Sequence, residues 1–408
     1  MVCVAAPFLF HRKYRDTFMC ESRTFLEIKN ALRGCIAFPY EAIRRSFSMN
    51  GIKLFNDLME YADGKGASDV HLVPGRTAML RIDGELTAAG QEDAAEWQDA
   101  DLTEVTEQIL SGDQLEEYRT KGALVCSYSF SEALRLRVSV YRQQGRDAMS
   151  VRLHPAGVPM PEELLLPEEI TELVKNGRGL LLVTGGRGSG VTTTVASLAA
   201  QIAATQSKVI VSVEDTTEYI LPQGRGLVVQ REIGADCASR EEALAMALQQ
   251  DADVILLDGI GNEREAGLLF AAVRRGQFVI LAEKEDSVTA ALLHLVQCGG
   301  STSGSQILLE SLAQGLAGAM AQKLLRRQDE AGRVAAYEVL VADAGVRSLI
   351  AENRIQQLDT SAGAEKERGR VQMDDAIYNL YMKSCITSGT AIAGAKDPED
   401  MRRKVRLF

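Results

Sequence analysis

Apolar residues along the chain form short continuous runs that alternate with longer segments of helical spacing. Four runs have the length of buried strands, at residues 180–184, 208–213, 253–257 and 277–282, and residues 332–340 form a last one. A Gly/Ser-rich stretch, residues 299–305, precedes a segment for which we expect a helix, and the part after residue 340 is also expected to be helical. Strands that alternate with helices predict an α/β fold with a mainly parallel sheet, whose ligands bind at the carboxyl ends of the strands.

The pattern before residue 153 is different. Leu54, Leu58 and Tyr61 share one face of an expected helix, and residues 67–72 and 78–86 are strand-like runs broken by turn residues. These features predict a smaller α+β domain. His71 alternates with apolar neighbours, so we expect it to be a structural hydrogen-bonding group.

Residues 134–152 alternate apolar and basic positions, which predicts a β-hairpin with several arginines on one face, among them Arg137 and Arg142. Such a face is often simply solvated. Guanidinium groups also suit phosphate oxygens, so these arginines are candidates to contact a phosphate bound elsewhere.

The domain boundaries follow from composition. Four of the nine prolines fall between His154 and Pro167, which indicates a linker at residues 154–170. It separates an N-terminal domain, 49–153, from a C-terminal domain, 171–408. Residues 1–48 hold 6 of the 11 Phe and carry 8 Lys+Arg against 4 Asp+Glu, or +4, whereas the whole chain carries −11. We expect a misassigned start with Met49 as the first residue; a genuine extension is the alternative.

Composition narrows the class of protein further. The net charge of −11 argues against a general nucleic-acid binder. The seven cysteines are scattered without a Cys-x-x-Cys pair, which indicates a reducing, cytoplasmic compartment and no structural zinc. No stretch free of charges has the length of a membrane span, so we expect a soluble protein that is at most peripheral to a membrane.

Residues 180–203 have the layout of a phosphate-binding loop, with a buried strand, a glycine-rich turn and a helix. The pattern Gly-x-x-x-x-Gly-Lys-Ser/Thr is met except for its lysine, whose position holds Val191. Glycine backbone N–H groups and the helix N-terminus remain available to phosphate oxygens, but the cation is missing. A glycine-rich turn without a ligand is the alternative. The candidate nucleotide-binding residues are Gly185, Gly188, Ser189, Gly190, Thr192 and Thr193.

Acidic residues follow the neighbouring strands. Glu214 and Asp215 end the second strand, and Asp258 ends the third. Carboxylates opposite a phosphate loop suit Mg²⁺ and its water ligands, so Thr192 and Asp258 are the candidate metal residues.

Several ordered motifs resemble the secretion and pilus ATPases, most closely the PilT type of pilus retraction motor. The matching stretches are 67–72 with 81–84, the acidic pair 214–215, residues 230–232, and 345–350. The resemblance implies a RecA-like P-loop ATPase domain behind a PAS-like N-terminal domain. It also implies ATP with Mg²⁺ as ligands, a hexamer, an inner-membrane pilus platform as partner at the cytoplasmic face, and Arg137 or Arg142 near nucleotide.

The departures from this family fall where its chemistry resides. Besides Val191, the catalytic glutamate after the third strand is replaced by Gly259, and a histidine after the fourth strand by Lys284. Loss of one preorganised electrostatic group costs on the order of 10²–10³ in rate, and such losses within one unit do not multiply. No catalytic position is intact, although Glu214 remains a candidate.

Three functions remain open. The first is a pseudo-ATPase that binds ATP weakly or not at all and regulates a pilus motor, as a homo-hexamer or together with an active paralogue. The second is an active retraction ATPase in which Arg187 or Lys284 compensates for the lost lysine. The third is a non-motor adaptor that joins hexamers.

Overall fold

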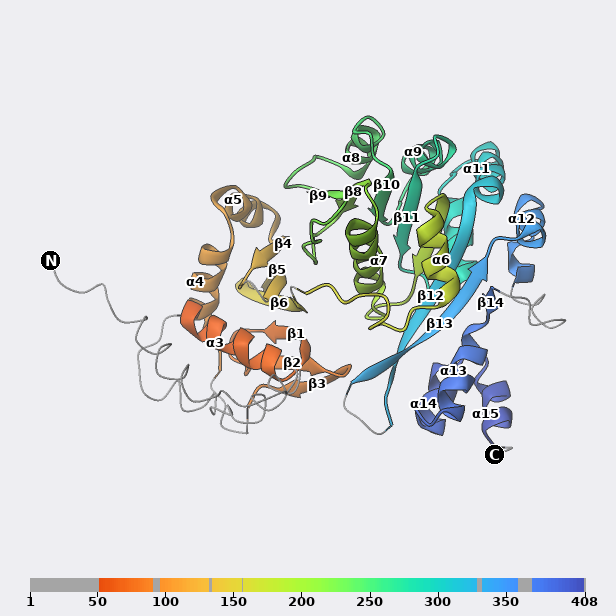
Figure 1. Ribbon diagram of the computed structural model, residues 1–408. Coiled ribbons are helices and arrows are strands. Elements are labelled where there is room, and N and C mark those ends of the chain that lie inside the picture. Colours follow the sequence, from red (N-terminus) through yellow and green to blue (C-terminus); the bar gives the residue numbers. More distant parts are fainter. Residues whose placement is uncertain are drawn as a thin grey trace, which may run out of the picture.

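The computed structural model describes residues 51–90, 96–131, 134–155, 157–328, 332–358 and 369–406. They form two sheet-centred parts that lie side by side (Figure 1). The prediction about residues 1–48 and the start at Met49 lies outside the described residues. In the described part of the chain, no helix is long and apolar enough to cross a membrane.

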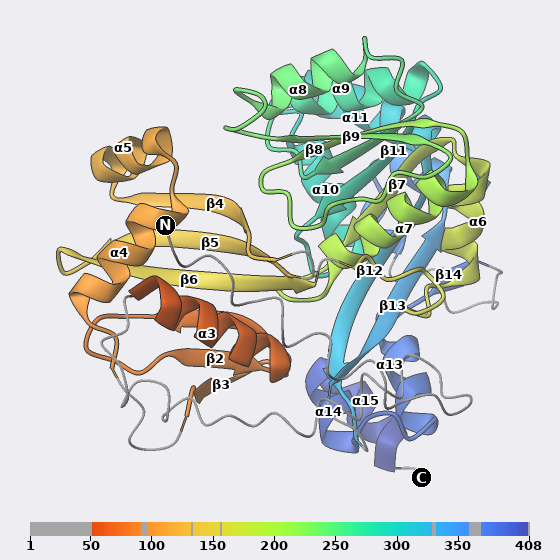
Figure 2. The ribbon, with the colours of Figure 1, turned by 60° about the vertical axis from the view of Figure 1, so that its left-hand side comes forward.

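The N-terminal part is a six-stranded antiparallel sheet in the order β3-β2-β1-β6-β5-β4, with its helices gathered on one side (Figure 2). Its apolar core joins Phe55 and Leu58 of the first helix to Val138 and Val151 of the sheet. His71 forms a hydrogen bond of 3.0 Å with Ser150 of the neighbouring strand, consistent with a structural role. The elements are α3 (Gly51–Gly64), β1 (Ala67–Leu72), β2 (Met79–Ile82), β3 (Glu85–Ala88), α4 (Asp99–Ile109), α5 (Gly112–Lys121), β4 (Ala123–Ser129), β5 (Leu134–Gln143) and β6 (Arg146–Pro155).

The C-terminal part is an eight-stranded sheet in the order β14-β13-β12-β7-β11-β10-β8-β9. The run from β12 to β9 is parallel, and β13 and β14 are antiparallel additions. Its strands are β7 (Gly179–Thr184), β8 (Val209–Glu214), β9 (Leu227–Glu232), β10 (Val254–Asp258), β11 (Phe278–Glu283), β12 (Leu316–Arg326), β13 (Arg333–Val341) and β14 (Arg370–Val371).

Helices cover both faces of this sheet, because strand side chains alternate between two apolar clusters. Leu181 and Val183 pack against one cluster, beneath α6 (Glu168–Asn176) and α7 (Val191–Thr205). Leu180 and Leu182 pack into the larger opposite cluster. That cluster is covered by α8 (Arg240–Ala247), α9 (Glu263–Arg274), α10 (Val288–Gln297), α11 (Thr302–Gly315), α12 (Ala344–Ala351), α13 (Met373–Met382), α14 (Ser388–Gly394) and α15 (Pro398–Arg406).

The fold class predicted from the sequence is confirmed: a mainly parallel α/β domain follows a smaller domain with an antiparallel sheet. The strand expected at residues 332–340 formed as β13, but the expectation of helix alone between residues 305 and 332 was wrong, because α11 is followed by β12. The short β14 also forms in the part after residue 340 that was expected to be helical. Residues 316–326 are rich in Ala, Leu and Met, which favour helices. Pairing with β7 on one side and β13 on the other overrides that preference.

A nucleotide site without its lysine

The phosphate loop lies between the end of β7 and the start of α7. Gly188 and Gly190 have positive φ angles of 74° and 91°, which glycine adopts without strain. A side chain at Gly185 would collide with Ser189 and come within 2.7 Å of the Gln322 carbonyl. The loop therefore has the conformation that the glycine pattern predicts, and its backbone N–H groups precede a helix N-terminus.

Gln322 of β12 connects the loop to the first turn of α7 through two hydrogen bonds. Its side-chain amide donates to the Ser189 carbonyl at 2.8 Å and accepts from the Thr194 hydroxyl at 2.8 Å. Gln322 is buried, so both bonds form away from water. No sequence pattern identified this residue, because its role depends on the pairing of β12 with β7.

Val191 occupies the lysine position and packs, partly buried, against the apolar cluster beneath α7. Arg187, a candidate replacement for the lysine, is exposed. Burial is the main cause that lowers the pKa of His71. The charges of Arg81 and Arg187 act in the same direction, against that of Asp69, so the charge of Arg187 reaches the N-terminal domain. At the lysine position itself, the loop therefore presents an apolar side chain and no cation.

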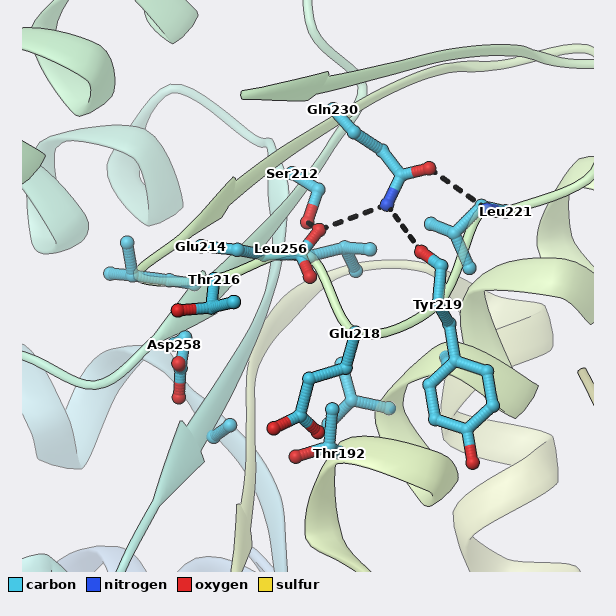
Figure 3. Close-up of a pocket in the computed structure, with 14 residues that line it drawn as sticks. Thr192, Ser212, Glu214, Thr216, Glu218, Tyr219, Leu221, Gln230, Leu256 and Asp258 are labelled. Atoms are coloured by element: carbon cyan, nitrogen blue, oxygen red, sulfur yellow. Dashed lines mark hydrogen bonds between the residues drawn. The ribbon is translucent and has the colours of Figure 1, made fainter. Parts of the chain in front are cut away.

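A small cavity opens beside Thr192, at the carboxyl ends of β8 and β10 (Figure 3). Its volume of about 40 Å³ suits a few water molecules and not a nucleotide. The charged side chains that line it are Glu214, Glu218 and Asp258, all of them acidic. Sequence analysis named Thr192, Glu214 and Asp258 as candidate site residues, and all three line this cavity. It missed Glu218, four residues beyond Glu214.

Burial perturbs the acids in this cavity. Desolvation raises the pKa of Glu214 to about 7, against the opposing effect of its hydrogen bonds with Ser212 at 2.7 Å and Gln230 at 3.0 Å. Desolvation also raises the pKa of Asp258, and the Lys284 ammonium, 3.8 Å from its carboxylate, acts in the opposite direction. Burial therefore disfavours the negatively charged forms of these carboxyl groups, and the phosphates of a nucleotide would add further negative charge beside them.

Gly259 follows Asp258 and has a positive φ of 81°. The next backbone N–H groups are held by carboxylates, with Ile260 donating to Glu283 at 3.2 Å and Gly261 donating to Glu265 at 2.8 Å. Asn262 then caps α9. These contacts fix the turn in a conformation that favours glycine at position 259. The sequence analysis identified this position as that of the catalytic glutamate in the secretion and pilus ATPases.

The two candidate arginines of the N-terminal sheet lie in different places. Arg137 forms an ion pair with Glu218 at 3.1 Å, so it reaches the wall of the cavity. Arg142 lies over the Tyr118 ring, 5.8 Å from its centroid, at the far end of β5. Within one chain, therefore, only Arg137 of these two approaches the candidate site.

Further contacts join the N-terminal sheet to the segment between β8 and β9. Arg135 donates to the Thr217 carbonyl at 2.7 Å, and Ser127 donates to Glu232 at 3.0 Å. His154, which sequence analysis did not single out, is buried with Nε2 3.6 Å from Glu218. The N-terminal domain thus contacts the same segment that lines the cavity.

The two residues predicted to bind Mg²⁺ offer oxygen ligands of the type that this ion prefers. The Thr192 hydroxyl and the Asp258 carboxylate line the same cavity. Among the described residues, no group of three His, Cys, Asp or Glu side chains could hold a metal ion by itself. Nucleotide phosphates would have to complete the ligand set, and Lys284 already neutralises Asp258 in part.

A phosphate loop after one parallel strand, with acids at the ends of neighbouring strands, defines a protein of the P-loop nucleotide-binding class. The family model described as Type II/IV secretion system protein matches residues 49–392, and the chain belongs to this family. The chain is 28% identical over 327 residues to a twitching motility protein of Neisseria gonorrhoeae, covering 80% of this chain and 86% of the relative. It is 32% identical to YggR of Escherichia coli K12, an uncharacterized protein, covering 71% and 87%.

A crystal structure of the pilus retraction motor PilT with bound ADP superposes with a TM-score of 0.73 at 29% identity, covering 85% of this chain and 98% of that one. The resemblance to PilT-type ATPases stated from the motifs is therefore confirmed. The chain is a secretion-ATPase family member whose relatives act in pilus motility.

Proposed function

We propose that the protein is a PilT-like component of a type IV pilus system that acts as a pseudo-ATPase, regulating a motor without hydrolysing ATP at a useful rate. In this proposal it binds ATP weakly or not at all. Its place is the cytoplasmic face of the inner membrane, near the pilus platform protein, and it binds no nucleic acid.

The charge of the candidate site carries the proposal. Every charged side chain that lines the cavity beside Thr192 is an acid, and Val191 packs into the apolar cluster where a lysine would meet phosphate. Phosphate transfer depends on cations that neutralise developing negative charge. A site with this balance of charge weakens ATP binding and disfavours the transition state of phosphate transfer.

Retention of both domains supports an assembling protein. The twitching motility protein of Neisseria gonorrhoeae and the PilT structure are both matched over most of their length. We propose that the chain forms a homo-hexamer or enters hetero-oligomers with an active paralogue, with Arg137 near nucleotide at such an interface.

An active retraction ATPase with a compensated site is the second candidate. The observation in its favour is Lys284, whose ammonium lies 3.8 Å from Asp258. Glu214, with a pKa near 7, would then have to serve as the base that Gly259 no longer provides.

A reconstitution experiment separates the two. The full chain is added to a purified active PilT-type motor from the same organism, and phosphate release is measured together with co-elution. The proposal expects co-elution and a changed motor rate, with the same change when the added chain carries Thr192→Ala. A compensated ATPase would instead release phosphate alone and lose that activity with Thr192→Ala. A chain that neither co-elutes nor alters the motor contradicts the regulatory proposal.

A further inference from the structure

Lys284 lies where a cation can act on both the phosphate loop and Asp258. It follows β11, whose last residue, Glu283, pairs with Thr184 at the end of β7. Thr184 donates its hydroxyl to the Glu285 carbonyl at 2.7 Å and accepts from the Glu285 N–H at 3.0 Å. The backbone that carries Lys284 is therefore fixed beside the start of the loop.

The Lys284 side chain is free to change partners. It is 76% exposed, and its ammonium is 3.8 Å from an Asp258 oxygen. An ion pair this exposed contributes little to stability, so its rearrangement costs little. An incoming phosphate oxygen would meet an ammonium with three donors on a flexible stem.

Other charges near the loop do not fill this role. Arg333 is already engaged, because it donates to the Gly188 carbonyl at 3.1 Å, and the charge of Arg187 acts on His71 of the N-terminal domain. Asp286 works against phosphate, since a side chain on Gly186 would collide with its carboxylate. Arg137 also contacts a residue of the cavity, but it is held by Glu218, whereas Lys284 pairs with Asp258 at the carboxyl end of β10.

We propose that Lys284 takes the place of the divalent cation at this site, so that the protein binds the polyphosphate of ATP without requiring Mg²⁺. The inference rests on the proposed function in its weak-binding form, in which the site binds ATP and does not hydrolyse it. Mg²⁺ and the ammonium would compete for Asp258, and two cations that share one carboxylate repel each other. Because the lysine is part of the chain, no metal ion has to be bound from solution. The nucleotide is then held without the metal ion that hydrolysis uses.

The test is calorimetric titration of ATP into the full chain, once with excess EDTA and once with excess MgCl₂, with phosphate release followed in parallel. We expect binding in EDTA that Mg²⁺ does not strengthen. Lys284→Ala should weaken binding in EDTA by roughly tenfold or more, the order expected for a lost charged hydrogen bond. Lys383→Ala, at an exposed lysine after α13, is the matched control and should change nothing.

Asp258→Asn gives an independent readout with the opposite sign. It removes a negative charge and releases Lys284, so binding in EDTA should strengthen, whereas a magnesium-dependent site would lose affinity in MgCl₂. Binding that requires Mg²⁺, an unchanged affinity in Lys284→Ala, or no binding by the wild-type chain each overturns the inference. Absence of binding leaves the pseudo-ATPase proposal standing, whereas phosphate release in MgCl₂ refutes that proposal separately.

Discussion

At the scale of single residues, Gly259 lacks the carboxylate of a glutamate and also has a left-handed backbone conformation. Its φ of 81° is a conformation that costs other residues about 1–2 kcal/mol. An acid placed here would have room for its Cβ but would carry this conformational strain unless the turn moved. The replacement at Gly259 therefore coincides with a backbone conformation that favours glycine.

A matched pair of alanine variants tests this. Gly259→Ala should lower the free energy of unfolding by about 1 kcal/mol, because the added Cβ has space but the backbone is left-handed. Gly267→Ala, in the interior of α9 with nothing near its Cβ, should raise it by about 0.5–1 kcal/mol. Urea unfolding of both variants gives the two signs; a stabilised Gly259→Ala would show that the turn is not strained.

Glu214 predicts a pH dependence of stability. The unfolded chain loses this proton near pKa 4.5, whereas burial keeps it on the folded protein until about 7. Between these values the folded state binds more protons, so stability falls as pH rises. Glu214→Gln should therefore be more stable than wild type above pH 7, by up to about 3 kcal/mol, and equal to it below pH 4.5.

Thermal unfolding across this pH range measures the difference. Glu310→Gln, at an exposed acid of α11, is the control and should show no such trend. A difference between Glu214→Gln and wild type that does not vary with pH would mean that the pKa of Glu214 is the same in the folded and unfolded states.

At the scale of elements, β12 links the sheet to the phosphate loop through Gln322. Gln322→Leu keeps the apolar surroundings but leaves the Ser189 carbonyl and the Thr194 hydroxyl without their partner. Unsatisfied buried polar groups cost about 1–3 kcal/mol, so we expect a loss of that size in urea unfolding. Gln306→Leu, exposed on α11, should change stability little. Equal effects of the two variants would contradict a specific role for Gln322.

The elements that could be predicted are those whose patterns are local. The glycine loop, the apolar runs that became β7, β8, β10 and β11, and the 134–152 hairpin all formed where their patterns predicted. The missed strand β12 has helix-favouring residues and exists because two neighbours pair with it. Similarly, motifs were enough to predict Thr192 and Asp258 as site residues. Gln322 contacts Thr194, more than a hundred positions away along the chain, and His154 contacts Glu218, about sixty positions away, so no local pattern indicates either contact.

At the scale of the whole molecule, the N-terminal sheet is joined electrostatically to the wall of the cavity. Glu218 is buried and holds Arg137 at 3.1 Å, while the adjacent Tyr219 bonds Thr193 of α7 at 3.0 Å. A continuous path therefore runs from the N-terminal domain to the helix of the phosphate loop. Loss of Arg137 would leave a buried carboxylate with only His154 nearby.

Two arginine variants test this path. Arg137→Met should increase hydrogen exchange in residues 215–221, because an uncompensated buried charge favours opening of the segment. Arg142→Met, which removes an exposed arginine stacked on Tyr118, should leave this segment unchanged. Mass-spectrometric exchange of both variants gives the comparison. Equal protection in the two variants would show that the domains are coupled by other contacts.

The central claim, that this secretion-ATPase family member does not run the family's reaction, is tested most directly by phosphate release from the full chain at saturating Mg-ATP. The account predicts no release above that of the Thr192→Ala variant, because Val191 replaces the lysine of the loop, Gly259 supplies no base, and the charged side chains that line the cavity are all acids. Steady turnover that Thr192→Ala abolishes would contradict it and establish a working motor with a compensated site.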